Sequence, residues 1–313
     1  MKGQFDHVPV MGREVVELFL PVPAGLVVDA TVGGGGHAAL LLEARPDLRL
    51  LGVDRDADAV SAARERLAGF GQRVQVVQGR FGELRAIVSE RDEGDVIAVL
   101  FDLGVSSAQL DRPERGFSYR FDAPLDMRMD SSQSLTASDV VNQYDQARLA
   151  SLIARYGEER FAGRIASAIV AARPVHGTRE LAEIVKTAIP AATRRRGPHP
   201  ARRTFQAIRM EVNQELPDLA AGLDDAVHLV GPGGRVAVLA YHSLEDRIVK
   251  ERFVGLSRQP ELPSKLPVRD TRPPAPFRLL SRRALRPTPQ EVDANPRAES
   301  ARLRSIERRV DAP

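Results

Sequence analysis

Four short apolar runs, rich in β-branched residues, recur at nearly equal spacing in the first third of the chain. They cover Leu26–Thr31, Leu50–Asp54, Val74–Gly79 and Val96–Asp102. Continuous apolar runs of this length predict parallel strands that are buried on both faces, and the spacing leaves room for one helix between consecutive strands. The sequence therefore predicts an α/β protein built on a doubly wound parallel sheet.

This rhythm breaks after the fourth run. The next comparable strand, Arg235–Tyr241, follows the turn Gly231–Gly234 and lies more than 130 residues beyond Val96. Helical apolar spacing predicts helices over 147–156, 158–172, 178–189 and 216–230. We therefore expect a doubly wound domain made of residues 1–111 and 206–313, interrupted by a helical substrate-recognition subdomain over 112–205. A proline-rich stretch after Gly255 predicts a long loop and an edge hairpin.

Composition excludes several kinds of chemistry. None of the 313 residues is a cysteine, which excludes disulfides, thiolate metal sites, iron–sulfur clusters and covalent thiol catalysis, and we expect no metal. No apolar run is long enough to span a membrane, and the first residues lack the apolar core of a signal peptide, so we expect a cytoplasmic protein without a membrane partner.

Charge is distributed unevenly, although the formal net charge is only +3. Residues 250–313 contain 15 basic and 8 acidic side chains, and the segment Arg194–Arg209 contains six arginines and no acidic residue. This pattern fits either a polyanionic partner or an arginine-rich solvated surface.

A run of four glycines, Gly33–Gly36, follows the first predicted strand and precedes His37. Glycine lets a ligand approach the backbone, and the following helix offers free N–H donors. Asp54 ends the second strand, where an acidic side chain can accept hydrogen bonds from ribose hydroxyls. The loop alone fits either a dinucleotide or S-adenosylmethionine, since His37 replaces the last glycine of the dinucleotide pattern. Phe81, after the third strand, is expected beside an adenine ring or in the core.

More polar residues follow the fourth and fifth predicted strands, at the edge where open α/β sheets bind ligands. The Asp102 carboxylate suits a sulfonium or an amine, and Gln109 adds a hydrogen-bonding group seven residues later. His242 is interpreted as a proton acceptor or as a hydrogen-bonded structural histidine, and Ser243 as a helix N-cap.

These motifs resemble, in the same order, those of the bacterial small-subunit ribosomal RNA cytosine-N4 methyltransferases of the MraW or RsmH type. The similarity runs from His7 to about Arg304. The segments that carry it are Asp29–His37, Asp54–Asp56, Asp102–Ser107, Arg115–Ser118, Pro124–Met129, Tyr156–Arg160, Thr204–Ala207, His242–Arg247 and Asn295–Arg297.

The resemblance implies a class I S-adenosylmethionine-dependent methyltransferase fold with a helical insertion. It implies methylation of N4 of a cytidine in the decoding region of 16S rRNA, with the small ribosomal subunit as partner and a homodimer as a possible assembly. The cofactor-binding residues that it implies are Gly35, Gly36, His37, Asp54, Phe81, Asp102 and Gln109.

We expect Asp102 to orient the cytosine amine, with His242 or Asp246 as second candidates. The arginine-rich segment combines phosphate-binding charge with an aromatic ring, and in view of the resemblance we interpret it as an RNA contact. Its residues are Arg194, Arg195, Arg196, Arg202, Arg203, Phe205 and Arg209.

Three residues depart from the family pattern. Tyr241 stands where the family usually has Phe, Arg202 where it has Thr, and Ala108 where it commonly has Pro. None of them removes an expected ligand, and Arg202 is expected to change an RNA contact.

The missing cysteines also favour an exocyclic amine as the target, because C5 methylation of cytosine normally needs a cysteine nucleophile. Alternatives are a methyltransferase acting on DNA or a small-molecule amine, a non-enzymatic RNA-binding ribosome assembly factor and, more remotely, a nicotinamide oxidoreductase.

Overall fold

The computed structural model describes residues 9–91, 94–105, 109, 112–194, 199–259 and 274–310. The chain forms two compact units. One, here called the sheet unit, comprises Met1–Gly104 and Pro217–Pro313, and the other, the helical unit, comprises Val105–Leu216.

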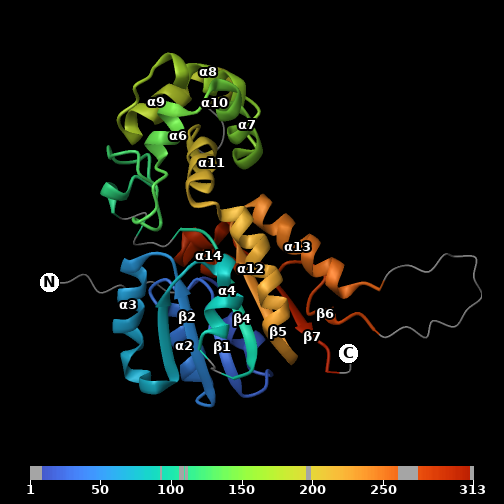
Figure 1. Ribbon diagram of the computed structural model, residues 1–313. Helices are drawn as coiled ribbons and strands as arrows, with labels where there is room; N and C mark the ends of the chain where they lie inside the picture. Colours follow the sequence, from blue (N-terminus) through green and yellow to red (C-terminus); the bar gives the residue numbers. More distant parts are fainter. Residues whose placement is uncertain are drawn as a thin grey trace, which may run out of the picture. The chain divides into compact units, whose positions relative to one another are not determined.

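The sheet unit is built on a seven-stranded sheet in the order β3-β2-β1-β4-β5-β7-β6 (Figure 1). Strands β1 to β5 run parallel, and β7 is antiparallel to both of its neighbours. The strands are β1 (Gly25–Asp29), β2 (Leu48–Asp54), β3 (Val74–Gln78), β4 (Val96–Asp102), β5 (Val230–Ala240), β6 (Phe277–Leu279) and β7 (Arg302–Arg308). The strand order reverses between β1 and β4, which places a topological switch point there.

Helices cover both faces of this sheet. Residues of α1 (Gly12–Phe19), α2 (Gly36–Ala44) and α3 (Ala57–Leu67) pack with one face. Residues of α4 (Leu84–Ser89), α12 (Glu215–Leu229) and α13 (Ser243–Ser257) pack with the other face. A doubly wound sheet with an antiparallel strand inserted before its last strand is the class I S-adenosylmethionine-dependent methyltransferase fold, so the predicted fold class is confirmed.

The helical unit interrupts the sheet between β4 and β5. Its helices are α6 (Ala137–Gln143), α7 (Gln146–Gly157), α8 (Ala162–Ala171), α9 (Thr178–Ala188), α10 (Ala191–Arg194) and α11 (Arg202–Asn213). Their apolar faces share one core, which includes Ile153, Ile165, Leu181 and Ile208. The expected helix over 158–172 begins later, because Glu158 has a φ of 48° and ends α7.

Helix α11 was not predicted, because its segment was interpreted by its arginines and one aromatic ring and not by the spacing of its apolar residues. Ala207, Ile208 and Val212 are nevertheless buried in the helical core. The helical unit therefore extends to Leu216, whereas the sequence placed its end at residue 205 and its start at residue 112 rather than at Val105.

The C-terminal strands β6 and β7 complete the sheet. They pair antiparallel at its edge, in agreement with the expected edge hairpin. Strand β6 lies at the edge, and β7 pairs with β5 from Arg235↔Glu307 to Ala240↔Arg302. After β6, helix α14 (Pro289–Ala294) supplies Glu291, whose Oε1 accepts a hydrogen bond from the Met11 backbone N–H at 2.5 Å. In the described part of the chain, no helix is both long and apolar enough to cross a membrane.

Candidate active site

The glycine loop leads from β1 into α2 and is held in a tight conformation. Gly33 and Gly35 have φ values of 52° and 77°, in the left-handed region that glycine tolerates. A Cβ on Gly35 would lie 3.1 Å from Leu67 Cγ, and one on Gly36 would lie 2.8 Å from Pro9 Cγ. At Gly34, by contrast, a Cβ would meet no atom within 4 Å among the described residues. Packing thus explains Gly35 and Gly36, and Gly34 is the position with open space beside the backbone.

Asp54 fixes the loop from the end of β2. Its Oδ2 accepts a hydrogen bond from Gly33 N at 2.9 Å, and its Oδ1 accepts one from Asp56 N at 2.9 Å. Asp56, not Asp54, caps α3 by accepting from Asp58 N. Burial raises the pKa of Asp54 to about 6. Each carboxylate oxygen keeps a second lone pair that can accept from a hydroxyl.

Asp29, at the end of β1, is a site residue that sequence reasoning did not single out. It is 1% exposed, and its Oδ1 accepts a hydrogen bond from Thr31 N at 3.2 Å. Burial raises the pKa of Asp29 to about 8, and the nearby carboxylates of Asp102 and Asp54 contribute in the same direction. Its place at a strand end, directly before the glycine loop, was the signal that could have identified it.

Asp102, the last residue of β4, is hydrogen-bonded to two parts of the sheet unit and lies close to a third. Its backbone N–H donates to Thr31 Oγ1 at 2.6 Å, and its Oδ1 accepts from the Tyr241 hydroxyl at 2.7 Å. His37 Nδ1 lies 3.4 Å from Asp102 Oδ2. Burial, and then the charge of Asp102, raise the pKa of Tyr241 well above its usual value, so the hydroxyl keeps its proton and donates.

His37 is itself anchored to the N-terminal segment. The imidazole is buried, and its Nε2 lies 2.9 Å from the Val10 carbonyl oxygen. Because a carbonyl only accepts hydrogen bonds, Nε2 carries a proton and Nδ1 is left to face Asp102. The structure therefore brings Gly35, Gly36, His37, Asp54 and Asp102 together around one edge of the sheet.

Phe81 follows β3, is half-buried, and packs against the Phe101 ring and the Arg55 guanidinium. Its ring packs edge-on against Phe101 at 5.9 Å between centroids, and the Arg55 guanidinium lies 5.3 Å from its centroid. Arg55 and Arg80 both donate to Asp218 of α12, at 2.6 and 2.8 Å. This ionic cluster ties the Phe81 loop to α12. The sequence does not reveal it, because Asp218 lies 163 residues from Arg55.

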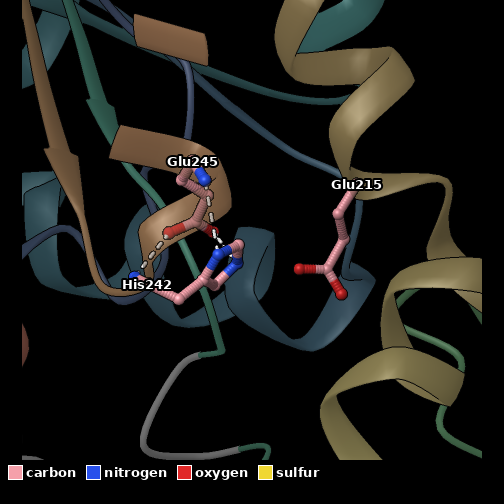
Figure 2. A group of neighbouring side chains, drawn as sticks. All are labelled: Glu215, His242 and Glu245. Carbon is pink, nitrogen blue, oxygen red and sulfur yellow. Dashed lines mark hydrogen bonds and ion pairs between the residues drawn. The ribbon is translucent and has the colours of Figure 1, made fainter. Parts of the chain in front are cut away.

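His242 and Glu245 form a capping box at the start of α13 (Figure 2). His242 Nδ1 accepts a hydrogen bond from Glu245 N at 3.3 Å, and Glu245 Oε2 accepts from Tyr241 N at 2.8 Å. His242 Nε2 lies 2.9 Å from Glu245 Oε1. The N-cap is therefore His242, and the prediction of Ser243 was wrong.

Asp246, the other second candidate, is engaged by two arginines of β7. It accepts hydrogen bonds from Arg304 Nε at 2.6 Å and from Arg302 at 2.9 Å. Burial alone would raise the pKa of Asp246, but these hydrogen bonds outweigh it and lower the pKa. The carboxylate thus joins α13 to β7 as a persistent anion, which does not suit a proton acceptor.

The remaining predicted residues belong to the helical unit. Gln109 is 6% exposed, and Arg202 and Arg203 are exposed at the start of α11. Arg209 pairs with Glu215 at 2.8 Å. Arg195, Arg196, Ser106, Ser107 and Ala108 lie outside the described residues, as does the side chain of Arg194.

Phe205 does not present its ring to a partner. It is 4% exposed and belongs to the core of the helical unit. The expectation that this ring stacks on RNA is therefore not supported by its position, because the amphipathic spacing of α11 turns it inward.

Comparison with known proteins identifies the family. The model of the MraW methylase family matches residues 4–309. The chain belongs to the MraW methylase family. It is therefore a methyltransferase, and the predicted family is confirmed.

Relatives of similar length support this assignment. Proteins named ribosomal RNA small subunit methyltransferase H from Thermobifida fusca and Acidothermus cellulolyticus are each 52% identical to it, over 96% of this chain and 93% of theirs. One of the same name from Symbiobacterium thermophilum is 48% identical, over 96% of both chains.

A structural role for His242 in this MraW family member leads to a prediction. Replacing His242 by Ala should lower the free energy of unfolding by about 1 kcal/mol, because α13 loses its cap. His242→Asn should retain most of the stability and the methyl-transfer rate, since asparagine is a good N-cap. Urea unfolding and initial rates measure both quantities. A rate loss above about a hundredfold in a stable His242→Asn protein would instead assign proton transfer to the imidazole.

Proposed function

We propose that this chain uses S-adenosylmethionine to methylate N4 of a cytidine in the decoding region of 16S rRNA, within the small ribosomal subunit. The observation that carries the proposal is Asp102 at the switch point of the sheet, held by the Tyr241 hydroxyl and by Thr31 beside the glycine loop. The names of the relatives, which specify small-subunit ribosomal RNA, support the substrate class.

The residues of the sheet unit fit the proposed cofactor. Asp54 has acceptor capacity for ribose hydroxyls, and Phe81 lies after β3, where an adenine ring would be flanked. Space beside Gly34 permits a close approach to the backbone. When bound, S-adenosylmethionine would supply an electrophilic methyl group on a positively charged sulfonium. Gly35, Gly36, His37, Asp54, Phe81, Asp102 and Gln109 remain the proposed binding residues.

Asp102 is the proposed residue for orienting the acceptor amine. A carboxylate whose position is fixed by the Tyr241 hydroxyl and by the backbone hydrogen bond to Thr31 can accept a hydrogen bond from N4 and draw its protons away from the attacking lone pair. His242 and Asp246 are not retained for this role, because one caps α13 and the other binds Arg302 and Arg304.

The composition supports an amine as the acceptor. Methylation at cytosine C5 normally proceeds through a cysteine adduct, and radical methylation needs a cysteine-bound cluster. The chain contains no cysteine. Methylation of an exocyclic nitrogen requires only positioning and hydrogen-bond acceptors, which the strand ends provide.

The test is methyl transfer from radiolabelled S-adenosylmethionine to 30S subunits that lack the modification, followed by nucleoside analysis. We expect N4-methylated cytidine in 16S rRNA, and no label in fully methylated subunits or in DNA. Label in DNA would favour a DNA methyltransferase. Cofactor binding without transfer to any substrate would refute the proposal and favour an assembly factor.

A further inference from the structure

A pocket of about 650 Å³ lies within the helical unit. It is lined by Tyr119, Arg120, His199 and Arg202. It is an open depression, so a ligand there would stay partly exposed to solvent. Arg202 begins α11 (Figure 1), and Tyr119 and Arg120 follow a glycine turn at Gly116.

Three aromatic rings, here called the aromatic tier, pack against one another beside the pocket. Phe205 is buried in the helical core, and the Tyr119 ring meets it edge-on with 5.5 Å between centroids. His199 stacks on Tyr119 with 4.5 Å between centroids and 14° between planes. His199 is exposed, whereas Tyr119 is half-buried. The outer ring of the tier therefore offers a flat aromatic surface to the pocket, and Phe205 supports that surface from below.

The imidazole of His199 is held in place before any ligand arrives. Its Nδ1 accepts a hydrogen bond from Ala201 N at 3.2 Å, and its backbone carbonyl accepts one from Arg202 N at 3.0 Å. A ring fixed by its own turn and by stacking loses little further freedom on binding, which favours affinity.

Two arginines line the same pocket as this ring. Arg120 and Arg202 are exposed, and neither guanidinium has a hydrogen bond or ion pair with any residue that the structure describes. A flat ring and two available guanidiniums that line one pocket match a nucleotide, whose base stacks while its phosphates pair with arginine. It does not match a lipid surface or an acidic peptide, which would need no stacking platform.

We infer that this pocket binds one unpaired base of single-stranded RNA, which stacks on His199 while Arg120 and Arg202 pair with flanking phosphates. The inference rests on the proposed function, because it takes the RNA to be the substrate. It also assigns Phe205 a positioning role, since that side chain supports Tyr119 and does not touch the RNA itself.

The test is fluorescence anisotropy of the full chain with a fluorescein-labelled, eight-nucleotide single-stranded RNA of cytidine and uridine. We expect His199→Ala to weaken binding about tenfold, because base stacking is lost. His199→Phe, which keeps an aromatic ring, should stay within about threefold of the wild type. The matched control is His176→Ala, since His176 is an exposed histidine of the same unit.

Salt dependence separates stacking from charge. Replacing both Arg120 and Arg202 by Ala should reduce the slope of log affinity against log salt by about 1.4, whereas His199→Ala should leave the slope unchanged. This double variant also tests the pocket without altering the aromatic tier. Melting temperatures establish that each variant is folded.

Two binding results would overturn the pocket, and one kinetic result would do so as well. One is wild-type affinity in a folded His199→Ala protein, and the other is equal loss of RNA and inorganic polyphosphate binding in that variant, which would indicate charge alone. Methyl transfer to 30S subunits with an unchanged KM in His199→Ala would reject the pocket and leave the proposed function intact. Oligonucleotide binding that depends on His199, without any methyl transfer by the wild type, would do the reverse.

Discussion

Asp102→Asn is expected to lower the rate of methyl transfer about a thousandfold. The substitution keeps the size of the side chain but removes its charge, and the amide nitrogen cannot accept the hydrogen bond from Tyr241 or from an amine. Initial rates with 30S subunits and calorimetric titration with S-adenosylmethionine measure the effects on turnover and on cofactor binding separately.

A matched control for this variant is the aspartate next to the other end of the same strand. Asp95 precedes β4 at its opposite end and is exposed. Asp95→Asn makes the same chemical change to the chain's net charge and should leave the rate within about twofold. A folded Asp102→Asn protein with a near-normal rate would remove Asp102 from the reaction.

The affinity for S-adenosylmethionine is expected to rise as the pH is raised from about 5 to 8. Burial raises the pKa of Asp54 to about 6 and that of Asp29 to about 8, so both carboxyls hold protons at the lower end of this range. A cationic ligand with donor hydroxyls favours the ionised carboxylates, so binding releases these protons. Each released proton steepens the dependence by up to about tenfold per pH unit.

The Asp29 and Asp54 carboxyls release their protons over different pH ranges. Above about pH 7 most of the contribution comes from Asp29, so Asp29→Asn should flatten the curve there, whereas the rise around and below pH 6 should persist through Asp54. Calorimetry in buffers of different ionisation enthalpy counts the protons released. Identical pH curves for the wild type and Asp29→Asn would show that Asp29 does not ionise on binding.

The free energy of unfolding changes with pH in the opposite direction to the cofactor affinity. In the unfolded chain a carboxyl titrates near 3.8, but folding raises the pKa of Asp29 to about 8, so the folded state binds the extra proton between these values. The stabilisation is complete below the unfolded pKa. It is lost by up to about 1.4 kcal/mol per pH unit as the pH rises toward 8. Asp29→Asn should weaken this decline, which urea unfolding at pH 5 and 8 would measure.

The centre of the sheet was predictable because strands β1 and β4 are buried along nearly their whole length. Strand β4 occupies the predicted range, and β2 begins two residues before its own predicted start. Strand β5 instead begins at Val230, because Val230 pairs with Val96 of β4 before a register shift that takes up the glycine turn. The side chains at the strand ends were predictable for the same reason, since Asp54 and Asp102 directly follow apolar runs.

Contacts between distant segments could not be predicted. The cluster of Asp218 with Arg55 and Arg80 joins a helix to two loops, and no local pattern links these residues. Helix α11 is a different case, because Phe205, Ile208 and Val212 have helical spacing that its arginines obscured. The inward position of Phe205 follows from that spacing.

The two far ends of the described chain meet beside the candidate active site. His37 is anchored to the Val10 carbonyl, the next residue Met11 donates to Glu291, and β7 pairs along β5. A ribosome synthesising this protein must therefore release almost the whole chain before the glycine loop acquires all of its supports. Nascent fragments that end before residue 291 lack both the clamp on Met11 and the outer partner of β5. We therefore expect the glycine loop and Met11 to acquire all of these supports only after residues 291–308 have been synthesised.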